Sequence, residues 1–230
     1  MAKEKTISIR PGGPYEVDAD IPRNQATSEP DERGAGKAWG KGKDYPAQAE
    51  PYHLCRCGHS KNKPFCDGSH NHEHFHDKEV AENIPYDEAA KRYTGDTVDL
   101  LDDEEYCAVA RFCDRGESVW TYAVASSAPG YEEEAIYQAC NCPSGRLTIQ
   151  KKNGEKIEPE LPQEISAIQD PAEDHRGPLW VKGGIKVVGQ EGKEYEVRNR
   201  MTLCRCGQSN NMPFCDASHL RCDHMKGHDE

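Results

Sequence analysis

The stretch LCRCGHSKNKPFCDGSH at residues 54–70 recurs as LCRCGQSNNMPFCDASH at residues 203–219. Both copies read C-x-C-x8-C-x3-H, and they share Arg, Gly, Ser, Asn, Pro-Phe, Asp and Ser between the residue types that ligate metals. An internal repeat of this density predicts two equivalent structural units, one built around each copy.

The repeat extends upstream of each copy. GPYEV at residues 13–17, followed by Ile21, resembles GPLWV at residues 177–181, followed by Ile185. The alternating residues 193–203 predict a strand that enters the second copy. In the first half, residues 23–50 are rich in Gly, Pro, Lys and Glu, and we expect them to form an irregular insertion.

The spacing of the donor residues suits two pairs. Cys55 and Cys57 are separated by one residue, so in extended backbone both side chains project to the same face and can hold one iron. Cys66 and His70 are four apart, which suits a turn, and can hold a second iron. The second copy repeats this arrangement with Cys204, Cys206, Cys215 and His219.

Three thiolates and one imidazole suit either a 2Fe-2S cluster or a Cys3His zinc site. The C-x-C spacing is tighter than that of the usual zinc knuckle.

Both segments resemble the CDGSH iron–sulfur family, whose pattern of C-x-C, Ser and Pro-x-Cys-Asp-Gly-Ser-His is met completely by the first copy. The second copy departs from the pattern only at Ala217, which replaces the glycine. The resemblance implies one 2Fe-2S cluster per motif, with the C-x-C cysteines on the inner iron and the later Cys and His on the outer iron. Family members place two motifs around a twofold axis, so it also implies an intramolecular pseudo-dimer. The outer histidine would raise the reduction potential and make the cluster sensitive to acid.

Between the motifs lie four further cysteines, Cys107, Cys113, Cys140 and Cys142. Ala110 stands where a bacterial ferredoxin has its second cysteine, and the segment resembles divergent single-cluster ferredoxin-like domains that read C-x5-C and end in Cys-Pro-Ser-Gly. Three cysteines favour a 3Fe-4S over a 4Fe-4S cluster, unless Cys140 becomes the fourth ligand. The alternative is a domain that has lost its cluster and keeps buried thiols, a small metal site or a disulfide.

The fold class that we predict is α+β. Residues 1–76 and 171–230 would form the two CDGSH units, residues 77–105 an acidic connector with a helical stretch at 86–93, and residues 106–170 a ferredoxin-like middle domain. Within that domain we expect a strand at 119–125, a helix at 131–139 and a hairpin turn at Asn153-Gly154.

The composition narrows the functional classes. The formal charge of −12 argues against nucleic acid and anionic membranes as partners, while it suits either a basic redox partner or plain solubility. The chain begins without an apolar leader and has no apolar stretch of the roughly 20 residues that span a bilayer, so we expect a cytoplasmic protein. Only 35% of the residues are hydrophobic, and eleven cysteines in a reducing compartment indicate metal ligands that help to hold small cores together.

The function that the sequence predicts is electron transfer with a redox partner protein. The alternatives are cluster transfer to an apo acceptor or redox and pH sensing, and a structural metal-binding adaptor. We find no Ser-His-Asp arrangement and no phosphate-binding loop, which favours a non-enzymatic carrier, either a monomer with internal pseudo-twofold symmetry or a homo-oligomer. The histidine-rich tracts 70–76 and 222–228 are more typical of solvated surface than of metal sites, and Cys222 is interpreted as a spare thiol.

Overall fold

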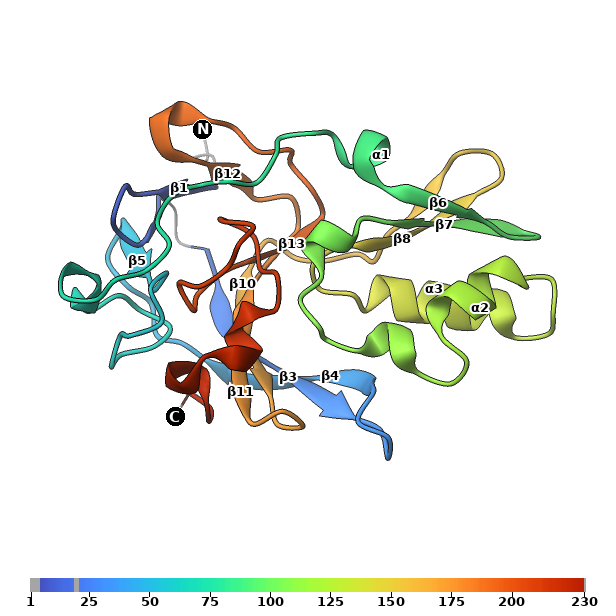
Figure 1. Cartoon of the computed structure of the whole chain (residues 1–230), viewed down its shortest axis with the longest axis horizontal. Coiled ribbons are helices and arrows are strands. Elements are labelled where there is room, and N and C mark those ends of the chain that lie inside the picture. The colour runs from blue at the N-terminus through green and yellow to red at the C-terminus, as the bar shows by residue number, and fades with distance from the viewer. Residues whose placement is uncertain (1–4, 19–20, 230) are drawn as a thin grey trace.

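The computed structural model describes residues 5–18 and 21–229 and contains three sheets (Figure 1). The first sheet has the order β12-β1-β2-β5 and comprises β1 (Thr6–Ile9), β2 (Tyr15–Val17), β5 (Tyr52–Leu54) and β12 (Lys186–Val188). The second has the order β13-β11-β10-β3-β4 and comprises β3 (Arg23–Pro30), β4 (Gly36–Asp44), β10 (Ile165–Asp170), β11 (His175–Lys182) and β13 (Arg200–Leu203). The third has the order β6-β7-β8-β9 and comprises β6 (Lys91–Thr94), β7 (Val98–Asp102), β8 (Leu147–Lys151) and β9 (Lys156–Ile157).

The first two sheets exchange a strand. β12 follows β11 in the chain but pairs in parallel with β1, and β3 follows β2 but pairs in parallel with β10. The registers match: Ile7 faces Val187 on β12, and Ile165 faces Arg23 on β3. Each sheet therefore contains a strand from the other half of the chain, and neither can be completed by one half alone.

The prediction of an irregular insertion at residues 23–50 was wrong. Residues 23–30 and 36–44 form the antiparallel pair β3–β4, although β4 contains three glycines. Burial alternates along β3, which is the signature of a strand with one covered face. On β4, Trp39 stacks on Phe112 of the middle segment and packs at a tilt against Trp180 of β11, with ring centroids 5.0 and 4.8 Å apart. Packing against neighbouring elements therefore outweighs the weak strand propensity of the glycines.

The middle segment is an antiparallel sheet covered by two helices, α2 (Val119–Val124) and α3 (Tyr131–Cys140), as Figure 1 shows. The predicted helix at 131–139 and the hairpin turn at Asn153-Gly154 are confirmed. The predicted strand at 119–125 was wrong, because Ser118 caps a helix through the Thr121 N–H and a buried face forms from Val119 and Ala123, four residues apart.

Two further expectations are corrected in part. The connector at residues 77–105 contains α1 (Tyr86–Ala89) and then strands β6 and β7 of the third sheet, so the middle unit begins before residue 106. The strand expected over 193–203 is restricted to 200–203.

Short 3₁₀ helices complete the described chain: η1 (Ser69–Asn71), η2 (Glu104–Tyr106), η3 (Phe112–Asp114), η4 (Gln190–Gly192), η5 (Ser218–Arg221) and η6 (Asp223–Met225).

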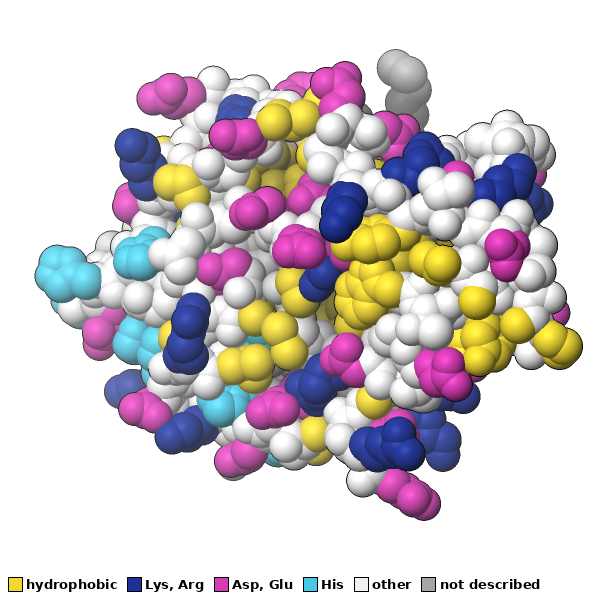
Figure 2. Space-filling view, turned by 45° about the vertical axis from the view of Figure 1, so that its right-hand side comes forward, with side chains coloured by type: hydrophobic (Ala, Val, Ile, Leu, Met, Phe, Trp, Pro, Cys, Tyr) yellow, Lys and Arg dark blue, Asp and Glu magenta, His cyan; other side chains and the backbone are white. Residues whose placement is uncertain are grey.

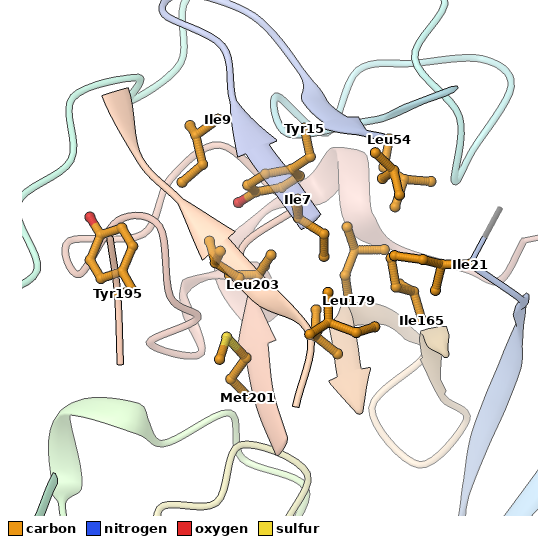
Figure 3. Packing of buried hydrophobic residues seen from close by; sticks show 14 of the residues in the cluster. Ile7, Ile9, Tyr15, Ile21, Leu54, Ile165, Leu179, Tyr195, Met201 and Leu203 are labelled. Atoms are coloured by element: carbon orange, nitrogen blue, oxygen red, sulfur yellow. The ribbon is translucent and has the colours of Figure 1, made fainter. Parts of the chain in front are cut away.

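The largest core lies between the first two sheets (Figure 3). It is built from side chains of both halves, among them Ile7, Leu54, Ile165 and Leu203. Tyr15 is fully buried there, and its hydroxyl donates a 2.6 Å hydrogen bond to the carbonyl of Cys204 in the other half. The two repeats thus share one core, which holds both motifs in fixed positions.

The surface is strongly charged. On the face shown in Figure 2, acidic and basic side chains are interspersed, so the net charge of −12 is not gathered into one patch there. Among residues 5–18 and 21–229, no helix combines the length and the apolar character needed to cross a bilayer.

Candidate metal sites

The first motif forms a loop that folds back onto β5. The Cys55 N–H donates to the carbonyl of Pro64 (2.8 Å), and the Cys66 N–H donates to the carbonyl of His53 (2.9 Å). This closure brings the donors together in pairs. The sulfurs of Cys55 and Cys57 are 3.8 Å apart, and the sulfur of Cys66 is 3.3 Å from Nδ1 of His70.

The second motif has the same arrangement. The sulfurs of Cys204 and Cys206 are 3.5 Å apart, and the sulfur of Cys215 is 3.4 Å from Nδ1 of His219. In both copies Nδ1 is the ring nitrogen that faces the thiol. The eight predicted site residues are therefore brought together as two equivalent sets of two pairs.

Backbone N–H groups point at the sulfurs. The N–H of Gly58 donates to Cys55 (3.3 Å), and those of Gly68 and Ala217 donate to Cys66 and Cys215, each at 3.4 Å. Ala217 has φ +67°, close to the left-handed conformation of Gly68 at +89°. The alanine thus preserves the N–H···S bond at a backbone cost of roughly 1–2 kcal/mol.

One aspartate shapes each loop. The carboxylate of Asp67 accepts from the N–H groups of Lys61 and Ser69, and Asp216 accepts from those of Asn210 and Ser218. The hydrogen bond from Lys61 is the main cause that holds the pKa of Asp67 below its usual range. The "D" of the repeated CD(G/A)SH sequence therefore orders the backbone around the donor residues.

The two motifs contact each other through their glycines. A Cβ atom on Gly58 would lie 2.8 Å from the carbonyl oxygen of Cys206, and one on Gly207 would lie 2.7 Å from that of Cys57. Both glycines have positive φ, at +84° and +74°. The contact is reciprocal, so each glycine is required by the backbone of the other motif.

The outer pairs differ in exposure. Cys66 and His70 are partly exposed, whereas Cys215 and His219 are each only 3% exposed. Burial lowers the pKa of His219 to about 4, which keeps its imidazole neutral and its ring nitrogen able to bind a metal. The two sites are equivalent in donors but not in access to solvent.

Two buried arginines support the motifs, and this role was not predicted from the sequence. Nε of Arg56 donates to the carbonyl of Gly13 (2.8 Å), and Nε of Arg205 donates to that of Gly177 (2.6 Å). Arg205 also forms an ion pair with Asp229 at 2.7 Å, with both side chains 1% exposed. The shared Arg of the two C-R-C sequences was the signal that could have revealed this role.

Three of the four middle cysteines line a cavity of about 160 Å³. Cys107, Cys113 and Cys142 line it, together with Ala110 at the position of the missing ferredoxin cysteine. Cys140 does not line the cavity; its sulfur lies 3.9 Å from the carbonyl oxygen of Ile157. The structure therefore brings together three of the four middle cysteines and separates the fourth.

The middle site is joined to the second motif. Arg200 of β13 is 1% exposed and donates to the carbonyls of Ala139, Cys140, Cys142 and Leu147 at the end of α3 and the start of β8. Tyr106, which precedes Cys107, packs edge-on against Phe214, which precedes Cys215, with ring centroids 4.9 Å apart. The side chain of Asn211 donates to the carbonyl of Glu105 (2.7 Å).

None of the eleven cysteines, all of which lie in the described residues, forms a disulfide. Over the described ranges, no three His, Cys, Asp or Glu side chains gather closely enough to hold a single metal ion. Sulfur and imidazole donors in pairs, with backbone N–H groups directed at the sulfurs, fit an iron–sulfur cluster, which spreads its ligands over more than one iron.

Comparison with family models agrees with this donor chemistry. The model described as "Iron-binding zinc finger CDGSH type" matches residues 12–71 and 176–220. Both terminal segments are CDGSH domains. The model described as "Divergent 4Fe-4S mono-cluster" matches residues 93–152, between the two CDGSH domains. The chain is thus an iron–sulfur protein, as the sequence predicted. The comparisons with curated proteins and with solved structures gave no match.

Proposed function

We propose that the protein is an electron carrier with two 2Fe-2S clusters and a third cluster between them. Cys55, Cys57, Cys66 and His70 would hold the first 2Fe-2S cluster, and Cys204, Cys206, Cys215 and His219 the second. The observation that carries the proposal is the reciprocal contact of the motifs at Gly58 and Gly207, which fixes two sites of the same donor set side by side. A 2Fe-2S cluster supplies a one-electron couple when bound.

The strand exchange supports the view that the CDGSH domains form an intramolecular pseudo-dimer. Each half contributes β12 or β3 to the sheet of the other, with matching registers, and the two halves share one core. Such an arrangement gives a single chain the two motifs that family members place around a twofold axis.

For the middle segment we propose a ferredoxin-like domain with a 3Fe-4S cluster held by Cys107, Cys113 and Cys142. The cavity lined by these three thiols and Ala110 supports this nuclearity, because alanine offers no donor for a fourth iron. Cys140, whose sulfur is directed elsewhere, is not needed as a ligand.

A redox protein is the partner that this function requires, and the cytoplasm is the compartment that we propose, since it keeps thiol ligands reduced. The direct test is to count iron and acid-labile sulfide in anaerobically purified protein and to titrate it with reductant under EPR. About four irons per chain correspond to the terminal clusters alone, and about seven to all three sites. Reversible one-electron uptake without loss of iron supports a carrier, whereas a colourless zinc protein without sulfide would overturn it.

A second candidate is delivery of the first cluster to an apo acceptor. The partial exposure of Cys66 and His70 favours it, because an acceptor could reach this outer pair but not the buried pair of the second motif. Incubation with an apo-ferredoxin separates the two functions. In delivery, absorbance lost by this protein appears in the acceptor, while a carrier keeps its iron.

The role of the imidazoles can be tested by His70→Cys and His219→Cys. Thiolate is a stronger donor than neutral imidazole and adds negative charge, so each variant is expected to lower the reduction potential of its own cluster and to slow the loss of that cluster in acid. Potentiometry and the decay of visible absorbance measure both effects. Unchanged potential and decay in both variants would exclude the histidines as ligands.

A further inference from the structure

The two CDGSH domains differ three residues after the outer histidine. The first has Glu73 at this position, and its side chain is exposed. The second has Cys222, which is 8% exposed and belongs to a buried cluster with Cys204, Cys206, Met212 and Met225. An extra sulfur therefore lies inside the second site and has no counterpart in the first.

The thiol of Cys222 lies beside a ligand of the second site. The sulfurs of Cys206 and Cys204 are 3.5 Å apart, and Cys222 belongs to the same buried cluster as both of them. The Cys222 thiol also lies 3.2 Å from the carbonyl oxygen of Ser218, the residue before His219. In the first motif, the sulfur of Cys57 lies 3.8 Å from that of Cys55, and Glu73 stands at the position equivalent to Cys222.

The surroundings of Cys222 suit a ligand more than a reactive surface thiol. Met212 and Met225 are fully buried and cover it with apolar, polarizable groups. Cys222 is only 8% exposed and is therefore largely shielded from solvent and from oxidants that attack surface thiols.

We propose that Cys222 is a reserve ligand of the second site, able to replace Cys206 on the iron. This inference rests on the proposed 2Fe-2S cluster at that site. In the exchange, one Fe–S bond forms to Cys222 and one breaks to Cys206, while the proton of the Cys222 thiol passes to Cys206. No electron is gained or lost. The second site would thereby retain its cluster under conditions in which the first site releases it.

A matched pair of variants in the full chain tests the exchange. Cys206→Ala is expected to keep the second cluster through Cys222, whereas Cys57→Ala is expected to lose the first, because the equivalent residue, Glu73, offers no thiol and its side chain is exposed. The double variant Cys206→Ala/Cys222→Ala should then lose the second cluster. The readouts are iron and sulfide per chain and the EPR spectrum of anaerobically purified protein. Equal losses in Cys206→Ala and Cys57→Ala, in folded proteins, would refute the proposal.

A second measurement does not depend on removing a primary ligand. In the presence of an iron chelator, Cys222→Ala is expected to speed the loss of the second cluster and to leave the first unchanged. Glu73→Cys should slow the loss of the first. If Cys222→Ala has no effect on either decay, Cys222 is not a reserve ligand. Absence of sulfide from the wild-type protein would instead reject the cluster itself, so the two failures are distinguishable.

Discussion

Asp229 shows how a single residue holds the second motif in place. Its carboxylate, 1% exposed, pairs with Arg205 at 2.7 Å and with Arg176 at 2.9 Å. Burial acts to raise the pKa of Asp229, but the attraction of Arg205, with a hydrogen bond from Gln169, outweighs burial and holds the pKa below its ordinary value. Arg56, the counterpart of Arg205, also donates to carbonyls, but its guanidinium faces the ring of Phe75 rather than a carboxylate. The second motif therefore depends on an ion pair that has no counterpart at Arg56 among the described residues.

Asp229→Asn is expected to lower the free energy of unfolding at neutral pH by about 3–5 kcal/mol, because it leaves the buried guanidinium of Arg205 without its counter-charge. The ion-pair contribution is complete above the ordinary aspartate pKa of about 3.9 and is lost as the pH falls through the lower folded-state pKa. The gap between wild type and variant should thus be constant at neutral pH and narrow only in strong acid. Urea unfolding at several pH values measures it.

The control for this prediction is Asp223→Asn. Asp223 pairs with Lys226 on the surface and is 91% exposed, so little change in unfolding is expected. Equal effects of the two substitutions would mean that the Arg205–Asp229 pair does not support the second motif.

Among single residues, the sequence allowed us to predict those site residues that are defined by their spacing along the chain. The eight donors of the terminal motifs could be selected because C-x-C and C-x3-H place neighbours on one side of a short loop. The exclusion of Cys140 could not be predicted, since it depends on how the last turn of α3 is oriented. The proximity of Cys222 to Cys206 could not be predicted either, because it arises only when the C-terminal segment packs against the second motif.

At the scale of elements, patterns within one element were more informative than those that depend on packing. Helix α3 and the β8–β9 hairpin followed from helical spacing and from Asn-Gly. Strand β4 was not predicted because its glycine-rich sequence is typical of a loop. The packing of Trp39 against Trp180 stabilises it as a strand. Helix α2 was missed because its alternating pattern also fits a helix with a short buried face.

Strand β13 carries the connection between the second sheet and the middle domain. Arg200→Met is expected to destabilise the protein by about 2–5 kcal/mol, because it leaves buried carbonyls without donors and breaks the ion pair with Glu158. Arg92→Met is the matched control, since Arg92 is half-exposed and its pair with Asp99 should contribute about 0–1 kcal/mol. Urea unfolding compares them. If Arg200→Met behaves like Arg92→Met, β13 does not hold the middle domain.

On the scale of the whole molecule, the three sites are not evenly connected. The middle site contacts the second motif through Tyr106 and Phe214, each next to a proposed ligand, and through Asn211. In the first motif the residue equivalent to Phe214 is Phe65, which packs against Tyr45 and Tyr52 of its own half. The second motif therefore connects the middle site to the first motif. The partly exposed His70 belongs to the first motif, which is the site most distant from the middle site in this series of contacts.

This order of contacts predicts a difference in magnetic coupling between the sites. In the proposed three-cluster protein, the middle cluster should speed the spin relaxation of the second motif more than that of the first, because magnetic interaction falls with distance. Cys113→Ser, which removes a ligand of the middle cavity, is expected to slow relaxation at the second motif and leave the first nearly unchanged. Cys140→Ser, outside the cavity, should alter neither. Power-saturation EPR of the reduced protein measures this, and equal changes at both motifs in Cys113→Ser would contradict the order derived from the Tyr106–Phe214 contact.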